Sequence, residues 1–113
     1  MAIAQNIIIN SDADYLKEFT AKDDTGTVID LTGYTVAAQL RKTYASSAST
    51  TFAPVIVSAT LGTFTLALTD VQTATGTLER GRHVYDVTIT DGSGDITRIQ
   101  EGIATVSPSV TRT

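Results

Sequence analysis

The stretch LGTFTLALT, residues 61–69, decides the fold class of this chain. Its large apolar side chains, Phe64, Leu66 and Leu68, alternate with threonine or alanine, so one face of an extended segment is apolar and the other is solvated. The stretch RHVYDVTIT, residues 82–90, alternates in the same way. Period-two patterns of this clarity predict antiparallel β-strands with one buried face.

Short runs of the same period recur on both sides of these two stretches, separated by turn residues. Threonine, of which the chain holds 21, is β-branched and suits the solvated face of a strand. The pattern predicts an all-β sandwich of about seven or eight strands rather than an α/β fold. The expected strands are 6–10, 15–23, 29–43, 51–60, 61–69, 82–90 and 96–108.

Four single residues mark points where the ladders are interrupted. Pro54 has no N–H to give to a ladder, so either its strand is an edge strand or Pro54 lies at the start of that strand. Gly102 lies in the middle of the last strand and suggests a β-bulge there. Gly26 suits the positive φ of a hairpin turn, and Pro108 ends the last strand.

One short helical turn is expected near 70–76, in the segment DVQTATGTL. Thr69 or Asp70 is placed to cap its first turn, and Gly76 is placed to end it. No other segment has the period of a helix, which keeps the prediction within the all-β class.

The size of the chain predicts a single domain, residues 1–113. Its hydrophobic fraction of 42% is too high for a disordered tail, so a packed core is expected. We expect flexible tails at about 1–6 and 107–113, and a flexible polar loop at 44–50. Cysteine is absent, which excludes disulfides and thiolate metal sites.

The charge pattern narrows the class of partner. The chain carries 12 acidic and 8 basic residues, and its longest basic run is Arg41 with Lys42. Nucleic acids and anionic membranes both require a basic patch, so we expect neither as a partner. The first ten residues, MAIAQNIIIN, have no basic region and no long apolar core, so we expect neither a signal peptide nor a membrane span, and synthesis in the cytoplasm.

His83, the one histidine of the chain, is the first candidate for catalysis. A general base needs a nucleophile and an orienting acid within hydrogen-bond reach. Strand alternation places His83 on the same face as Tyr85 and places Asp86 on the opposite face, so a His–Asp pair is not expected. We interpret His83 as an ordinary histidine at the start of a strand.

Tyr85 follows a glycine-bearing corner, LERGR, near the start of its strand. In immunoglobulin-like sandwiches, a tyrosine in such a place can bond back to the corner's backbone, a motif called the tyrosine corner. The alternatives are a plain core tyrosine and a surface tyrosine, and the sequence leaves the three open.

The segment DGSGD places Asp91, Ser93 and Asp95 at alternate positions, as a calcium loop would. An EF-hand loop also needs glycine at its sixth position and glutamate at its twelfth, where this chain has Ile96 and Gly102. The segment NSDAD at 10–14 fails at the same two positions, so both segments are interpreted as turns, with a looser surface calcium site as the alternative.

No catalytic motif is present. The chain contains no GxSxG, HExxH or GxxxxGK[ST] pattern, and its serine-rich loops have no basic partner nearby. We therefore predict that the chain is not an enzyme and that it has no catalytic, cofactor-binding or metal-binding residues.

Three segments together resemble a known family. They are DDTGTVIDLTGYTVAAQLRK (23–42), GTFTLALTDVQTATGTLERG (62–81) and VYDVTITDGSGDITRIQEGIATVSPSVTR (84–112). With DLTGY, LALT, YDVTI and the closing VTR in this order, the chain is similar over about residues 7–112 to the immunoglobulin-like N-terminal domain of phage baseplate upper proteins.

The resemblance implies an immunoglobulin-like antiparallel β-sandwich that anchors to other virion proteins and has no catalytic residues. The implied role is a structural protein of a bacteriophage particle, as an adaptor of tail, baseplate or neck, or as a decoration protein on the capsid. The implied location is the virion, in multiple copies within a symmetric assembly. Sheet edges and the two tails are the parts expected to contact neighbours.

A carbohydrate-binding or adhesive module is the alternative function. Such a module stacks sugars on exposed aromatic side chains, and this chain has only three Phe and four Tyr, most of which the core requires. Tyr34 and Tyr44, which lie near loops, are the two candidates.

Overall fold

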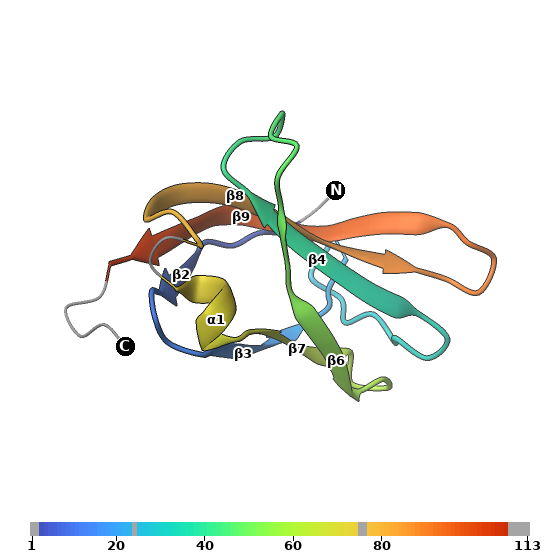
Figure 1. Cartoon of the computed structure of the whole chain (residues 1–113). Helices are drawn as coiled ribbons and strands as arrows, with labels where there is room; N and C mark the ends of the chain where they lie inside the picture. Colours follow the sequence, from blue (N-terminus) through green and yellow to red (C-terminus); the bar gives the residue numbers. More distant parts are fainter. Residues whose placement is uncertain (1–2, 24, 75–76, 109–113) are drawn as a thin grey trace.

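Strand β7 (Thr63–Leu68) follows the predicted alternation and forms the centre of one of two packed sheets. Phe64, Leu66 and Leu68 are buried, whereas the residues between them are half-buried. The computed structural model describes residues 3–23, 25–74 and 77–108, and Figure 1 shows them as a sandwich of two sheets with one short helix. The all-β sandwich expected from the sequence is confirmed.

The two sheets contain nine strands in the described part of the chain, slightly more than the seven or eight expected. The smaller sheet has the order β3 (Tyr15–Thr20), β7, β6 (Ala53–Ser58). The larger sheet has the order β1 (Ile3–Ala4), β9 (Ile96–Ser107), β8 (Gly81–Thr90), β4 (Thr35–Arg41), β5 (Thr50–Thr51), and β2 (Ile7–Asn10) also pairs with β9.

This strand order is that of an immunoglobulin-like sandwich. The smaller sheet matches the B, E and D strands of that fold, and β9, β8 and β4 match its G, F and C strands. Strand β5 adds a short strand beside β4, as in variable-type domains. The hairpins and the β3–β7, β6–β7 and β4–β8 pairs are antiparallel, as expected.

The N-terminal segment departs from the antiparallel pattern and from the expected flexible tail. Strands β1 and β2 run parallel to β9, with one register along both. Between them, the Gln5 N–H donates to the Glu101 carbonyl, and the Ile103 N–H donates to the Asn6 side chain. Residues 3–6 are therefore part of the larger sheet, and residue 107 is the last residue of β9. Residues 1–2 and 109–113 lie outside the described residues.

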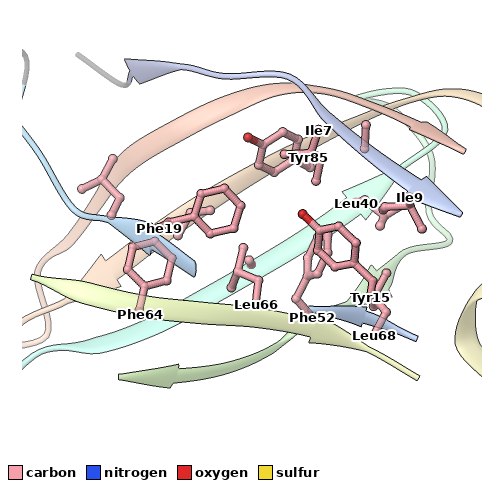
Figure 2. Close-up of a cluster of buried hydrophobic side chains, with 14 of the residues drawn as sticks. Ile7, Ile9, Tyr15, Phe19, Leu40, Phe52, Phe64, Leu66, Leu68 and Tyr85 are labelled. Atoms are coloured by element: carbon pink, nitrogen blue, oxygen red, sulfur yellow. The ribbon is translucent and has the colours of Figure 1, made fainter. Parts of the chain in front are cut away.

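The core lies between the two sheets, and five aromatic side chains are buried in it (Figure 2): Tyr15, Phe19, Phe52, Phe64 and Tyr85. Phe52 lies at its centre, with ring centroids 6.0 Å from Tyr15 and 6.4 Å from Tyr85. Phe19 stacks on Phe64 at 5.7 Å. Such tilted and stacked pairs stabilise a core beyond their area burial, by roughly 0.5–1.5 kcal/mol each.

The helical turn forms where it was expected but ends earlier. Helix α1 (Asp70–Thr73) begins with a capping box, in which the Thr69 hydroxyl accepts from the Gln72 N–H and the Gln72 side chain accepts from the Thr69 N–H. Its C-cap is Ala74. Gly76, the expected terminator, lies outside the described residues.

Gly102 does not mark a bulge, so that prediction is wrong. The register shift in the β8–β9 ladder lies at Ile99, where Val87 pairs with Gln100 and Thr88 pairs with Arg98. Gly102 itself pairs regularly with Tyr85. A Cβ atom at Gly102 would overlap the Gln5 carbonyl oxygen, because the backbone of the N-terminal segment lies against this residue. Glycine is therefore required at this position.

The predictions for the other marked residues hold. Among the residues that the structure describes, strand β6, which contains Pro54, pairs with β7 alone and is an edge strand. Gly26 has a φ of 87° in the turn that follows Asp23, and its N–H donates to the Asp23 carbonyl. Strand β9 ends at Ser107, directly before Pro108.

Candidate interaction surface

His83 has the orientation predicted from alternation. It is buried on the inner face of β8 with Tyr85, and its Nδ1 lies 3.4 Å from the Gly81 carbonyl oxygen. Burial lowers the pKa of His83 below its ordinary value. Asp86 lies on the outer face, where it pairs with Arg98 at 3.3 Å. The two groups that resembled a catalytic pair in sequence are therefore separated by the sheet.

The DGSGD segment is the turn of the β8–β9 hairpin. One carboxylate oxygen of Asp91 accepts hydrogen bonds from the N–H groups of Ser93 and Asp95, at 2.9 and 3.0 Å. The carboxylate thereby closes its own turn, which explains the spacing that suggested a calcium loop. Across the described residues, no group of three or more His, Cys, Asp or Glu side chains is arranged to hold a metal ion.

Tyr85 does not form a tyrosine corner, because its hydroxyl does not bond to the LERGR corner. The hydroxyl donates to the Gln5 carbonyl, at 2.5 Å, and accepts from the Gln100 side chain, at 2.9 Å. Gln100 is itself buried. Tyr85 is thus a core tyrosine that attaches the N-terminal segment to the centre of the larger sheet.

One opening on the surface lies along one side of the sandwich, beside β4. It is a groove of about 490 Å³ that is lined by residues of β4, of β8 and of the segment from Thr51 to Pro54, and we call it the side groove. Its only charged side chain, Asp86, is paired with Arg98. The groove is lined by Val36, Ala37, Ala38, Gln39, Thr51, Phe52, Pro54, Asp86 and Thr88.

The side groove exists because the chain leaves the larger sheet after two residues of β5. Thr50 and Thr51 pair with β4, and the Phe52 N–H then donates to the Ala38 carbonyl at 3.0 Å. The next residues cross to the smaller sheet and pair with β7 as strand β6. As a result, the N-terminal half of β4 pairs with β8 on one side and has no paired strand on the other within the described chain.

A second hollow, of about 250 Å³, lies on the outer face of the larger sheet. Tyr44 lines it with 78% of its area exposed, beside Asp86 and Arg98. Arg41 also lines the hollow, and its guanidinium donates to the Ser46 carbonyl at 2.6 Å, which ties the start of the 44–50 loop to β4. Tyr34, the other aromatic candidate, is half-buried and packs against the core.

A third surface is the outer face of the smaller sheet, which is apolar at several points. Leu16 on β3 is 71% exposed, and Val55 and Val57 on β6 are both more than half exposed. The strand register sets Val55 beside Thr65 and Glu18 on the same face. The threonine side chains on this face make it less apolar than the inner face of the same sheet.

The sequence did not reveal the side groove or the role of Gly102. Both depend on which strands pair, and the alternation of side chains does not specify pairing partners. The signals that exist are indirect: Pro54 soon after Thr51 limits the length of β5, and Gly102 marks a close approach of another segment.

Comparisons with known proteins add no family to these observations. No family model matches the chain, and no curated protein matches it. No helix in residues 3–23, 25–74 and 77–108 is long and apolar enough to cross a membrane.

Proposed function

We propose that this chain is a non-enzymatic structural protein of a bacteriophage particle, acting through contacts with other virion proteins. The proposed place is the tail, baseplate or neck as an adaptor, or the capsid as a decoration protein, with several copies in a symmetric assembly. The proposed location is the mature virion, after synthesis in the host cytoplasm.

The observation that carries this proposal is where the family-like segments fall in the fold. DLTGY leads into β4, LALT ends β7 and YDVTI lies within β8, so the resemblance follows the strands of the sandwich in order. The closing VTR, residues 110–112, lies outside the described residues. A likeness that follows paired strands supports a shared fold and, by analogy, a shared anchoring role.

The surface supports an anchoring role in physical terms. Within the described residues, part of one edge of β4 has no paired strand beside the side groove, and the groove's one charged side chain is ion-paired. This combination favours contact with another polypeptide over contact with a polyanion. His83 and Asp86 point to opposite faces of the sheet, which favours a role without catalysis. Repetition in a symmetric particle would strengthen individually weak contacts by avidity.

Quantitative mass spectrometry of purified virions tests the proposal. A copy number comparable with that of the major capsid protein would identify a decoration protein. A copy number that matches the subunits of a single ring would identify a tail, neck or baseplate component. Absence of the chain from intact particles would overturn the proposal.

A matched pair of variants tests which face makes the contact. Ala37→Arg places a charge on the exposed outer side of β4, and Ala67→Arg places the same charge on the outer side of the smaller sheet. We expect Ala37→Arg to lower incorporation into particles at least about tenfold, since an unpaired charge in a desolvated contact is strongly unfavourable. Equal incorporation of the two variants would contradict a contact at β4.

Carbohydrate binding remains the second candidate because of Tyr44. This side chain is exposed beside the Asp86–Arg98 pair and Gln39, an arrangement of a flat ring with planar polar groups. A glycan array compares the native chain with Tyr44→Ala and with Tyr34→Phe as the control. Selective glycan binding that Tyr44→Ala abolishes and Tyr34→Phe retains would support this second function.

A further inference from the structure

Strand β4 directs backbone groups of alternate residues into the side groove. The Ala38 carbonyl accepts from the Phe52 N–H on that side, away from β8. Backbone N–H and C=O groups of one residue point to the same side of a strand, and successive residues alternate. Because the β4–β8 register runs without a shift, Val36 points its N–H and C=O to the same side as Ala38, and Thr35 and Ala37 point theirs toward β8.

Val36 is therefore the residue of β4 whose groove-side backbone groups have no paired strand within the described chain. Strand β5 pairs with Leu40 and Gln39, and the Phe52 N–H donates to the Ala38 carbonyl. After Phe52 the chain crosses to the smaller sheet. Within the described chain, no strand pairs with Val36 on the groove side. A strand edge of this kind is a template for another strand.

The shape of the side groove selects a single extended segment over the edge of a folded sheet. The chain that leads from β5 into β6 crosses β4 (Figure 1), and β6 contacts β4 without pairing with it. Pro54 is the residue of β6 that lines the groove. The side groove has a volume of about 490 Å³. Val36, which is half-buried, and Pro54, which is exposed, line the groove with apolar groups, so an added strand would cover surface that the sandwich leaves open.

We propose that the side groove binds an extended, uncharged polypeptide segment of a neighbouring protein as an added strand, antiparallel to β4 and continuing the β5 ladder past Phe52. The occupant is an uncharged segment because Asp86, the groove's charged side chain, is already paired with Arg98. The direction follows from β5, which already pairs antiparallel with β4 at this edge. This inference rests on the proposed function for the source of the segment.

A peptide titration tests the inference on the full chain. The probe is acetyl-Thr-Val-Thr-Val-Thr-amide, titrated into ¹⁵N-labelled protein at millimolar concentration, because a short ladder is expected to bind weakly. We expect saturable shifts of the Val36 and Ala38 amide resonances. The same peptide with alternate amides N-methylated lacks the ladder donors and is expected to leave these resonances unchanged.

Two variants at one position separate the ladder from the side chain. Val36→Pro removes the N–H on the groove side and leaves the β8 ladder donors of Thr35 and Ala37 in place, so the fold should tolerate it as edge strands do. Val36→Thr keeps that N–H and preserves the β-branched shape. We expect Val36→Pro to lower peptide affinity at least tenfold and Val36→Thr to change it less than about threefold.

The outcomes distinguish the inference from the proposed function. Absence of shifts at Val36 and Ala38, or unchanged binding in folded Val36→Pro, would overturn the inference even for a chain that is present in virions. Peptide binding by a chain that is missing from virions would support the groove and overturn the virion role. Self-association of the native chain that Val36→Pro abolishes would identify a second copy as the occupant, in place of a different protein.

Discussion

The Tyr85 hydroxyl lies 2.5 Å from the carbonyl oxygen of Gln5, which precedes it by 80 residues in the chain. This hydrogen bond joins the N-terminal segment to the middle of the larger sheet. The same hydroxyl accepts from the buried Gln100 side chain, so Tyr85 satisfies two polar groups that would otherwise be desolvated without a partner. A position that resembled a local corner in sequence is a long-range connection in the fold.

Tyr85→Phe should therefore destabilise the protein. The change leaves the Gln5 carbonyl and the Gln100 amide without their partner, and we expect the free energy of unfolding to fall by roughly 1–3 kcal/mol. Tyr15→Phe is the matched control, because the buried Tyr15 hydroxyl has no hydrogen-bond partner among the described residues. Urea unfolding should show Tyr15→Phe to be neutral or stabilising by up to about 1 kcal/mol. Equal losses in the two variants would contradict this account.

Gly102→Ala should displace the N-terminal segment. The added Cβ would overlap the Gln5 carbonyl oxygen, and overpacking of this kind typically destabilises by about 1–3 kcal/mol. Hydrogen exchange should show faster exchange at the Gln5 amide, which donates to Glu101 in the native sheet. Gly92→Ala is the control, since no atom lies within 4 Å of its added Cβ. Native exchange at Gln5 in Gly102→Ala would be inconsistent with a close crossing.

Thr73→Val should loosen the contact between helix α1 and the turn before β3. The fully buried Thr73 hydroxyl donates to the Ala13 carbonyl at 2.7 Å and accepts from the Ala13 N–H at 3.2 Å. Valine has nearly the same shape but no polar atom, so we expect a loss of roughly 1–3 kcal/mol in thermal or urea unfolding. Thr65→Val, on the half-buried outer side of β7, should change stability by less than about 0.5 kcal/mol.

The pH dependence of stability should reveal the buried His83. Burial holds the pKa of His83 below its ordinary value of 6.5, so just below pH 6.5 the unfolded chain binds a proton that the folded chain does not. The free energy of unfolding therefore falls as the pH drops from 6.5 to the folded-state pKa. His83→Gln should flatten this slope in urea titrations, and a slope that is unchanged in His83→Gln would assign the effect to another group.

Local chemistry determined much of this protein from the sequence alone. The alternation of Phe64, Leu66 and Leu68 placed β7 and its buried face, because side chains of a strand point to opposite sides in turn. The sequence offered Thr69 or Asp70 as the cap of helix α1, and Thr69 is the N-cap, because its hydroxyl accepts from the Gln72 N–H of the first turn. The opposition of His83 and Asp86 followed from the same two-residue period.

Only the tertiary structure decided which strands pair, since a strand's two edges present the same backbone groups whatever its sequence. It joined residues 3–10 to β9 in parallel, which gave Gly102 its role and gave Tyr85 its partner. It also moved the chain from β5 to the smaller sheet after Phe52. The side groove follows from that crossing, because within the described residues no strand then pairs with the β5 side of β4 between Thr35 and Ala38.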